Sequence, residues 1–381
     1  MTNKKFQTGN VLIISITHFI HDVYSSFLAP ILPLLIEKFS LTYTQAGLLT
    51  IFQRIPSLLN PIVGIMADKV GVKLLVIFSP AITVVVMSLL GIAPTYSILA
   101  VLLLVMGIAA SMFHVPAPVM IKQIAGERIG KGMSFFMLGG ELARSVGPLV
   151  VLGGISLWGL EGIYKLIPFG LTASLILYFK FRNLDLPKLV ENHESKKIYK
   201  VLKEFRSLFI MVLGILFFTS VIKGTLTTFL TVYLTNQGES LWYAGGALSI
   251  FQLAGAGGTF FSGSVSDKIG RRKILLFSAI INPVLLFLFV FTSGIISFIL
   301  ILLLGFFLFS FTPVLLAIVN ESKTVFPTFL NGIFMTINFI TSALAVALIG
   351  YSADYISLES TYIVSSLMGL ATIPFVLKVK S

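Results

Sequence analysis

The chain repeats the stretch LTIFQRIPSLLNPIVGIMADKVGVK (Leu49–Lys73) 199 residues later as LSIFQLAGAGGTFFSGSVSDKIGRR (Leu248–Arg272), without a gap. The identical pairs include Phe52 and Phe251, Gln53 and Gln252, Gly64 and Gly263, Asp68 and Asp267, Lys69 and Lys268, and Gly71 and Gly270. Each copy is an apolar segment followed by a short charged loop. The repeat therefore predicts two halves with the same local architecture.

The composition predicts that lipid is the solvent for most of this chain. It has 381 residues, of which 56% are hydrophobic and 11% charged, and its mean hydropathy is +1.00. Soluble domains carry about 25% charged residues, and a spanning helix needs about 20 mostly apolar residues. We identify twelve such segments, at 10–36, 44–66, 73–93, 96–122, 132–156, 160–181, 206–234, 242–266, 272–292, 296–320, 328–353 and 357–378.

The fold class that follows is an all-α membrane protein with twelve transmembrane helices in two pseudo-symmetric six-helix bundles. The repeat places the bundles at 1–181 and 206–381, joined by a cytoplasmic linker at 182–205. Parallel repeats of this kind put a binding site between the halves near mid-membrane. Within the linker, KKIYKVLKEF (Lys196–Phe205) is either a short amphipathic helix on the anionic leaflet or a solvated, positively charged connection.

The net charge of +12 indicates how the chain is oriented in the membrane, and we do not take it as evidence of nucleic-acid binding. Most of the 27 Lys and Arg residues lie on the side that holds both termini, which the positive-inside rule makes cytoplasmic. The first apolar run is too long for a signal-peptide core, so we expect it to be retained as a helix. We therefore expect a multi-pass protein of a prokaryotic cytoplasmic membrane, a monomer whose partners are lipid, protons and a small molecule, with no nucleic acid.

Neither a cofactor nor a metal is expected. The stretch GERIGKGMS (Gly126–Ser134) resembles a phosphate-binding loop, but only three residues separate Gly126 from Gly130, and Gly132 follows Lys131 where Ser or Thr is required. The chain has no cysteine, and no spacing typical of a nucleophile–base pair or of metal ligands stands out. We therefore do not expect an enzyme.

The repeated loops follow the pattern G-x-x-x-D-K-x-G, which resembles the signature of the major facilitator superfamily. One copy has Gly64, Asp68, Lys69 and Gly71, with Val72 where a basic residue is usual. The second copy comprises Gly263, Asp267, Lys268, Gly270, Arg271 and Arg272. The resemblance implies that these residues form a conformational latch at cytoplasmic helix ends, whereas their plain structural role would be to anchor those ends.

Three other stretches resemble the fosmidomycin-resistance branch of drug exporters: SITHFIHDVYSSFLAPILPLL (Ser15–Leu35), MFHVPAP (Met112–Pro118) and GGELARSVGP (Gly139–Pro148). Two positions depart from the branch, since His21 replaces an Asn and no Glu follows His114. The third stretch also resembles an antiporter motif, through Gly139, Gly140, Gly147, Pro148, Gly153 and Gly154. The resemblance implies proton-coupled export by alternating access.

Ionisable groups inside a bilayer are costly and mark candidate functional positions. His18 and Asp22 are spaced i, i+4 on one helix face, where they can pair and exchange a proton. The alternative is a fixed hydrogen-bonded pair that joins neighbouring helices. His21 projects about 100° away from Asp22 and is expected to face a different helix.

A second group lies near the middle of other predicted helices. Glu141 and Arg144 are spaced i, i+3 and can pair, either as a fixed pair or as a switch in which protonation of Glu141 frees Arg144 to hold an anion. We assign proton coupling to Asp22, His18 and Glu141. The candidate substrate-binding residues are His21, Arg54, His114, Arg144, Lys223, Gln53 and Gln252. Arg54 is expected to face Asp22 or Glu141, and recurrence of the two glutamines also fits a structural role.

These residues favour a proton-coupled antiporter that exports a drug or another small molecule. Three cations and two carboxylates among the intramembrane groups suit an anionic or zwitterionic substrate better than a lipophilic cation. A proton-coupled importer of an organic anion or nutrient would use the same residues. A non-transporting membrane sensor is the third alternative.

Overall fold

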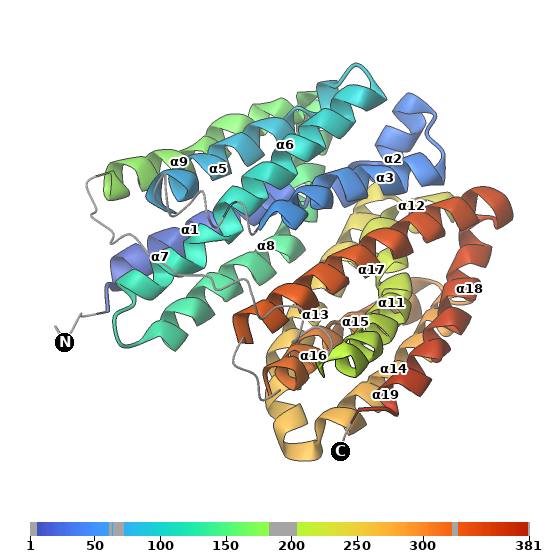
Figure 1. The fold of residues 1–381 in the computed structure, drawn as a ribbon. Helices are drawn as coiled ribbons and strands as arrows, with labels where there is room; N and C mark the ends of the chain where they lie inside the picture. The colour runs from blue at the N-terminus through green and yellow to red at the C-terminus, as the bar shows by residue number, and fades with distance from the viewer. Residues whose placement is uncertain (1–5, 61–62, 64–71, 183–203, 322–326, 380–381) are drawn as a thin grey trace. The chain divides into compact units, whose positions relative to one another are not determined.

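The computed structural model describes residues 6–60, 63, 72–182, 204–321 and 327–379. Within these ranges the regular elements are helices, without a strand. Nine described helices or helix pairs are long and apolar enough to cross a membrane. The other predicted spans correspond to α3 (Tyr43–Arg54) with η1 (Ile55–Leu59), to α13 (Leu241–Ile269), and to α18 (Leu358–Gly369) with η5 (Leu370–Thr372) and α19 (Ile373–Val376). The described part is thus an all-α membrane protein that fits the twelve-helix prediction (Figure 1).

Several predicted spans are divided in the structure. The first becomes α1 (Thr8–Ser25) and α2 (Leu28–Phe39), and the fourth becomes α6 (Tyr96–His114) and α7 (Pro116–Ile124), which begins at the proline. Proline removes a backbone donor and its ring clashes with the preceding turn, so a helix ends or bends before it. The break between α6 and α7 therefore leaves His114 at a helix end.

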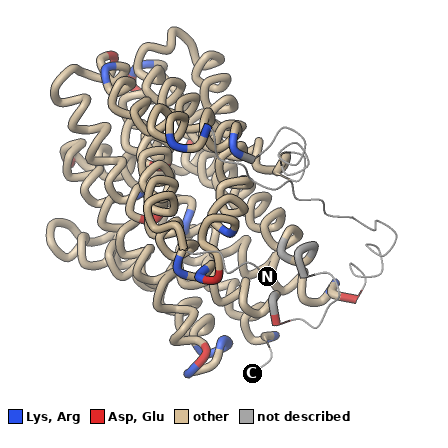
Figure 2. The backbone as a smooth tube through the Cα atoms, turned by 90° about the vertical axis from the view of Figure 1, so that its left-hand side faces the viewer, with Lys and Arg blue, Asp and Glu red and all other residues tan. Residues whose placement is uncertain are grey.

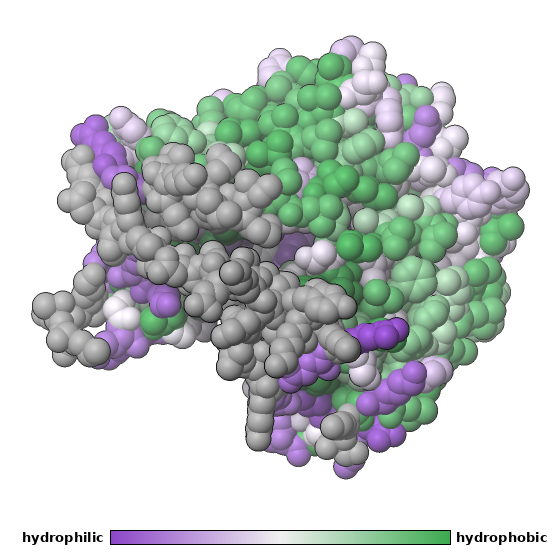
Figure 3. All heavy atoms as spheres, in the orientation of Figure 1, coloured by the Kyte–Doolittle hydropathy of each residue, from purple (hydrophilic) through white to green (hydrophobic). Residues whose placement is uncertain are grey.

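The remaining helices follow the predicted segments closely. In the first half they are α5 (Val72–Ser88), η2 (Leu90–Ile92), α8 (Ile129–Trp158), η3 (Leu160–Leu166) and α9 (Ile167–Phe181). In the second half they are α11 (Arg206–Thr228), α12 (Leu230–Asn236), α14 (Arg271–Val290), α15 (Gly294–Phe309), α16 (Phe311–Asn320) and α17 (Pro327–Ile356). Charged residues are sparse along the helices (Figure 2), and the coloured atoms in the upper and right parts of Figure 3 are mostly apolar, as lipid contact requires.

The chain divides into two compact units, Met1–Ser40 with Leu49–Glu191, and Leu41–Leu48 with Asn192–Ser381. In the first unit α1 packs mainly on α8, and α5 packs on α6 and α9. In the second, α13 packs on α15 and α11 packs on α17. The bundle boundaries and linker predicted at 182–205 stay a prediction, and Lys196–Lys203 of the predicted amphipathic helix lie outside the described residues.

The start of α3 clusters with the second unit. Asp354 of α17 accepts hydrogen bonds from the backbone N–H of Tyr43 at 2.6 Å and of Thr44 at 2.9 Å, and from the Thr44 hydroxyl at 2.6 Å. The first N–H groups of a helix have no partner within the helix, and a carboxylate satisfies them well. Asp354 therefore caps α3 from another helix.

Glycines let helix backbones meet in both units, and they do so at related places in the repeat. In the first unit a Cβ on Gly107 of α6 would collide with the Gln53 carbonyl of α3. In the second, a Cβ on Gly305 of α15 would collide with the Phe251 carbonyl of α13. Small residues at such contacts permit the close approach on which membrane helix packing depends. The sequence repeat is therefore also a repeat of helix packing.

We predict that Gly258→Ala destabilises the protein whereas Gly257→Ala, one residue away, does not. A Cβ at Gly258 would overlap the Phe306 backbone carbonyl, but at Gly257 it would only touch the Phe306 ring at 3.8 Å. Overpacking of this kind costs about 1–3 kcal/mol. Thermal unfolding of the two purified variants in detergent measures the difference, and equal unfolding temperatures would contradict the packing described here.

Candidate functional site

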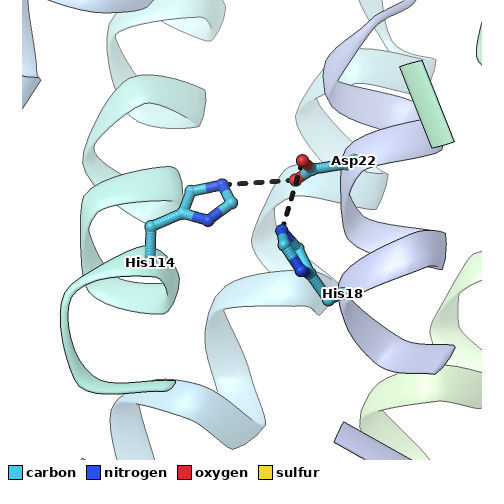
Figure 4. A group of neighbouring side chains, drawn as sticks. All are labelled: His18, Asp22 and His114. Carbon is cyan, nitrogen blue, oxygen red and sulfur yellow. Dashed lines mark ion pairs between the residues drawn. The ribbon is translucent and has the colours of Figure 1, made fainter. Parts of the chain in front are cut away.

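The candidate site is the carboxylate of Asp22, which three imidazoles contact inside the first unit. Asp22 Oδ2 lies 3.3 Å from His18 Nε2, and Asp22 Oδ1 lies 3.2 Å from His114 Nε2 (Figure 4). The His18 contact is the one that the i, i+4 spacing predicts. His114 comes from α6, whose end at Val115 and Pro116 brings this residue to α1. Helices far apart in sequence thus converge on one acid.

His21 is oriented differently from the expectation that it faces away from Asp22. Its Nδ1 lies 2.8 Å from Asp22 Oδ1, so the expectation was wrong for this contact. The reason is that the side-chain rotamers of adjacent residues can bring their ends together although their Cβ atoms project about 100° apart. The expectation that His21 faces a different helix is confirmed, because Nε2 lies 3.0 Å from the hydroxyl of Thr83 on α5. With Nδ1 as the donor to Asp22, neutral His21 accepts a hydrogen bond from Thr83.

Contacts of His18 fix its tautomer. Its Nδ1 lies 2.7 Å from the backbone carbonyl of Phe136 on α8, and since a carbonyl only accepts, this nitrogen carries hydrogen. The Phe136 ring also stacks on the imidazole, with centroids 4.0 Å apart. A neutral His18 would then direct the lone pair of Nε2 at the Asp22 carboxylate. The contact between Nε2 and Oδ2 is favourable only when a cation, of which the proton is the simplest, lies between them.

The site is closed on most sides and open at one histidine. His21 is fully buried and stacks on Phe113 with centroids 4.7 Å apart. His18 and Asp22 have side chains only 6% and 7% exposed, whereas the His114 side chain is 40% exposed. A solute would therefore reach the carboxylate past His114.

Gly140 allows α8 to approach the site. A Cβ at this position would lie 2.5 Å from His18 Cε1 and 3.2 Å from Asp22 Oδ2. Glycine is the only residue that leaves space for both side chains. In the sequence Gly140 belongs to the motif that resembles an antiporter motif, and only the fold shows that it leaves space for His18 and Asp22.

Glu141 and Arg144 form an ion pair on α8, as their spacing predicts. Their side chains are 18% and 41% exposed, so the pair is accessible. Arg54 ends α3, is exposed, and lies within electrostatic range of Arg144. Its expected position facing Asp22 or Glu141 stays a prediction.

Gln53 connects two helices of the site region. It donates a hydrogen bond from Nε2 to the Ser25 carbonyl at 2.7 Å, which ties α3 to the end of α1.

Two candidate residues belong to the second unit. Lys223 of α11 is half-buried, and its Nζ lies 4.0 Å from the centroid of the Phe309 ring. An ammonium over an aromatic face is stabilised by the ring quadrupole, which helps to retain a charge among apolar helices. Gln252 on α13 is partly buried.

A sequence profile of the Major Facilitator Superfamily matches residues 14–326 and 247–380. The chain belongs to this superfamily. It is 28% identical over 381 residues to the fosmidomycin resistance protein of Escherichia coli K12, covering 98% of this chain and 94% of that one. It is 27% identical over 280 residues to the multidrug resistance protein MdtG of Salmonella paratyphi C, covering 68% and 67%.

Solved structures of the superfamily have the same fold. A D-xylose–proton symporter superposes with a TM-score of 0.79 at 13% identity, covering 98% of each chain. A bacterial homologue of the lysosomal transporter Spinster superposes with a TM-score of 0.78 at 14% identity. Proteins of this superfamily are multi-pass membrane transporters of small molecules and not enzymes, which confirms those expectations for this chain.

The superfamily loop signature is described only in its second copy, because Gly64, Asp68, Lys69 and Gly71 lie outside the described residues. Arg271 Nη2 lies 2.9 Å from Asp267 Oδ1, and Arg271 Nε lies 2.8 Å from Glu321 Oε1. Hydrogen bonds from Arg271 lower the pKa of Glu321. Gly270 has a φ of +106°, which glycine adopts without strain, and it ends α13. Lys268 is exposed and Arg272 half-buried, and the latch role of the loop stays a prediction.

Sequence reasoning missed several residues that complete these sites. Thr83, Phe113, Phe136 and Glu321 were not candidates, because three are ordinary helix residues and the last follows α16. Only Phe113 could have been found from the sequence, because it directly precedes His114 in the stretch MFHVPAP. Ligand atoms of His18, Asp22 and His114 also lie within 4.8 Å of one another, a grouping able to hold a cation that no spacing in the sequence indicates.

We predict that His18 is protonated at Nδ1 in both its neutral and its charged form. The chain has four histidines, so the ¹⁵N spectrum of histidine-labelled protein in lipid is simple, and His18→Gln assigns the His18 signals. The expected spectrum of neutral His18 shows an Nδ1–H signal and an Nε2 without hydrogen. A neutral His18 protonated at Nε2 would contradict the hydrogen bond to Phe136.

Proposed function

We propose that this superfamily member is a proton-coupled exporter of small molecules that works by alternating access. The observation that carries the proposal is the buried carboxylate of Asp22 in contact with three imidazoles. The names of its relatives, which include fosmidomycin and multidrug resistance proteins, support export. Both termini are proposed to be cytoplasmic and one chain to be sufficient, with bundles at 1–181 and 206–381 joined by 182–205.

The proposed proton carrier is the pair of His18 and Asp22. The Phe136 carbonyl fixes hydrogen on His18 Nδ1, so one proton stabilises the contact between Nε2 and Asp22 Oδ2. When that contact opens and water reaches the carboxylate past His114, the proton can leave. His21, held by Thr83, stays hydrogen-bonded to the carboxylate and limits the cost of the charge that remains.

The proposed substrate is anionic or zwitterionic. Arg144 is partly exposed beside Glu141, and Arg54 lies within its electrostatic range. An arginine can hold a carboxylate or phosphonate with two parallel hydrogen bonds. Protonation of Glu141 would release Arg144 for the substrate, and loss of that proton would return Arg144 to its intramolecular partner. Lys223, His114 and the two glutamines, Gln53 and Gln252, are proposed as further binding residues.

We predict that Asp22→Asn reduces proton-coupled transport to background while the protein still inserts and folds. Asparagine keeps the size of the side chain but cannot bind and release the proton. A growth screen of overexpressing cells against inhibitors that include phosphonates first identifies a compound, and substrate-driven proton flux in liposomes then measures coupling.

The matched control is Glu127→Gln, which neutralises an exposed carboxylate in a loop and should leave coupling intact. Proton flux at the wild-type rate in Asp22→Asn would refute the assignment of the carrier. Hypersensitivity of the overexpressing cells, instead of resistance, would refute export and indicate uptake.

We predict that Arg144→Gln weakens binding of an anionic compound by about 10-fold or more and changes binding of a neutral analogue much less. A charged hydrogen bond contributes about 1.5–3 kcal/mol, which corresponds to such a factor. Lys223→Gln is expected to act in the same direction. Binding measured by calorimetry with the two compounds tests this, and equal losses for both would exclude an anion-holding role.

A further inference from the structure

We propose that His18, Asp22 and His114 form a binding site for a divalent late transition metal ion, with zinc as the type case. This inference does not depend on the transport function proposed above. It rests on the identity of the ligand atoms, their separations, the groups that hold them and their access to solvent.

The ligand set is two imidazole nitrogens and one carboxylate. His18 Nε2 and His114 Nε2 lie 3.3 Å and 3.2 Å from oxygens of Asp22, and the three candidate atoms lie within 4.8 Å of one another. Zinc bonds of about 2.0–2.1 Å in a tetrahedron place neighbouring ligand atoms about 3.3 Å apart. Two of the separations match this spacing, each through a different oxygen of Asp22, and rotation of the exposed His114 side chain would bring the third within it.

The two ligands of α1 are oriented by other groups, as in established metal sites. His18 donates from Nδ1 to the Phe136 carbonyl, which leaves the lone pair of Nε2 directed at Asp22. Asp22 accepts a hydrogen bond from His21 at Oδ1, and Thr83 holds His21 in place. Metal-bound histidines nearly always donate their other N–H to a carbonyl or carboxylate, and these outer contacts raise affinity.

The choice of metal follows from ligand type and access. Imidazole suits zinc, copper, nickel and cobalt, whereas calcium and magnesium prefer oxygen ligands alone. Three protein ligands leave a coordination position open, and His114, the most exposed member, gives that position a route to solvent.

Few other imidazole or thiolate groups in the chain could bind such an ion. The sequence has no cysteine and four histidines, three of which contact Asp22. The fourth, His193, lies outside the described residues. Zinc binding by this protein can therefore be assigned to the Asp22 site by single substitutions, with His193→Gln as the matched control.

The metal and the proton use the same lone pairs. Ligands must be deprotonated to bind zinc, so zinc binding releases protons.

The test is a titration of the purified full-length protein with zinc in detergent, using an affinity tag without histidine. We expect one site, with an affinity that falls about 10-fold or more in His18→Gln and in His114→Gln. His21→Gln, which removes an outer contact, should weaken binding by about 10–100-fold. His193→Gln should bind like the wild type. Calorimetry in buffers of different ionisation enthalpy counts the released protons.

Three outcomes would overturn the proposal: no binding by the wild type, wild-type affinity in both His18→Gln and His114→Gln, or loss of binding in His193→Gln. His114 is partly exposed, so His114→Gln keeps the test decisive even if His18→Gln fails to fold. The visible spectrum of the cobalt-loaded protein gives a second readout of the coordination number. Because these measurements need no gradient and no substrate, zinc binding can succeed or fail independently of proton-coupled export.

Discussion

A carboxylate buried between membrane helices needs partners, and this constraint organises the first unit. Desolvating Asp22 without compensation would cost several kcal/mol. The structure compensates with three imidazoles, of which two come from α1 itself and one from the end of α6. The second ring nitrogens of His18 and His21 are held in turn by Phe136 on α8 and Thr83 on α5. Four helices therefore meet at one acid.

This convergence depends on glycine. Gly140 leaves room for His18 and Asp22, and at Gly139 a Cβ would lie 2.5 Å from the Ser15 carbonyl, so α8 can lie against α1 along its length. The same device recurs in the second unit, where Gly255, Gly258 and Gly305 admit α15 to α13. At Gly139, Gly258 and Gly305 the helices thus approach close enough for a backbone carbonyl to lie against the glycine.

The fold could be predicted from the sequence because its signals are local or repeated. Three signals lie within short continuous stretches of sequence. They are the long apolar segments, the repeated stretch Leu49–Lys73, and the i, i+4 spacing of His18 and Asp22. The contacts that make the site are different in kind. His18 reaches Phe136 across 118 residues and His21 reaches Thr83 across 62, and neither partner has a composition or spacing that distinguishes it. The contact between the adjacent residues His21 and Asp22 depends on side-chain rotamers, which helix geometry does not predict.

The arrangement on α8 connects the two chemical roles assigned to the first unit. Gly140 leaves the space that His18 and Asp22 fill, and the next residue, Glu141, pairs with Arg144 one turn further on. On the proposed function, a change in the distance between α1 and α8 would alter the space around His18 and Asp22 and would carry the Glu141–Arg144 pair along with α8. On the proposed function, coupling does not need a chain of side chains between two remote sites. It needs only that one helix carries a glycine against the proton pair and an ion pair beside it, because a rigid helix moves both together.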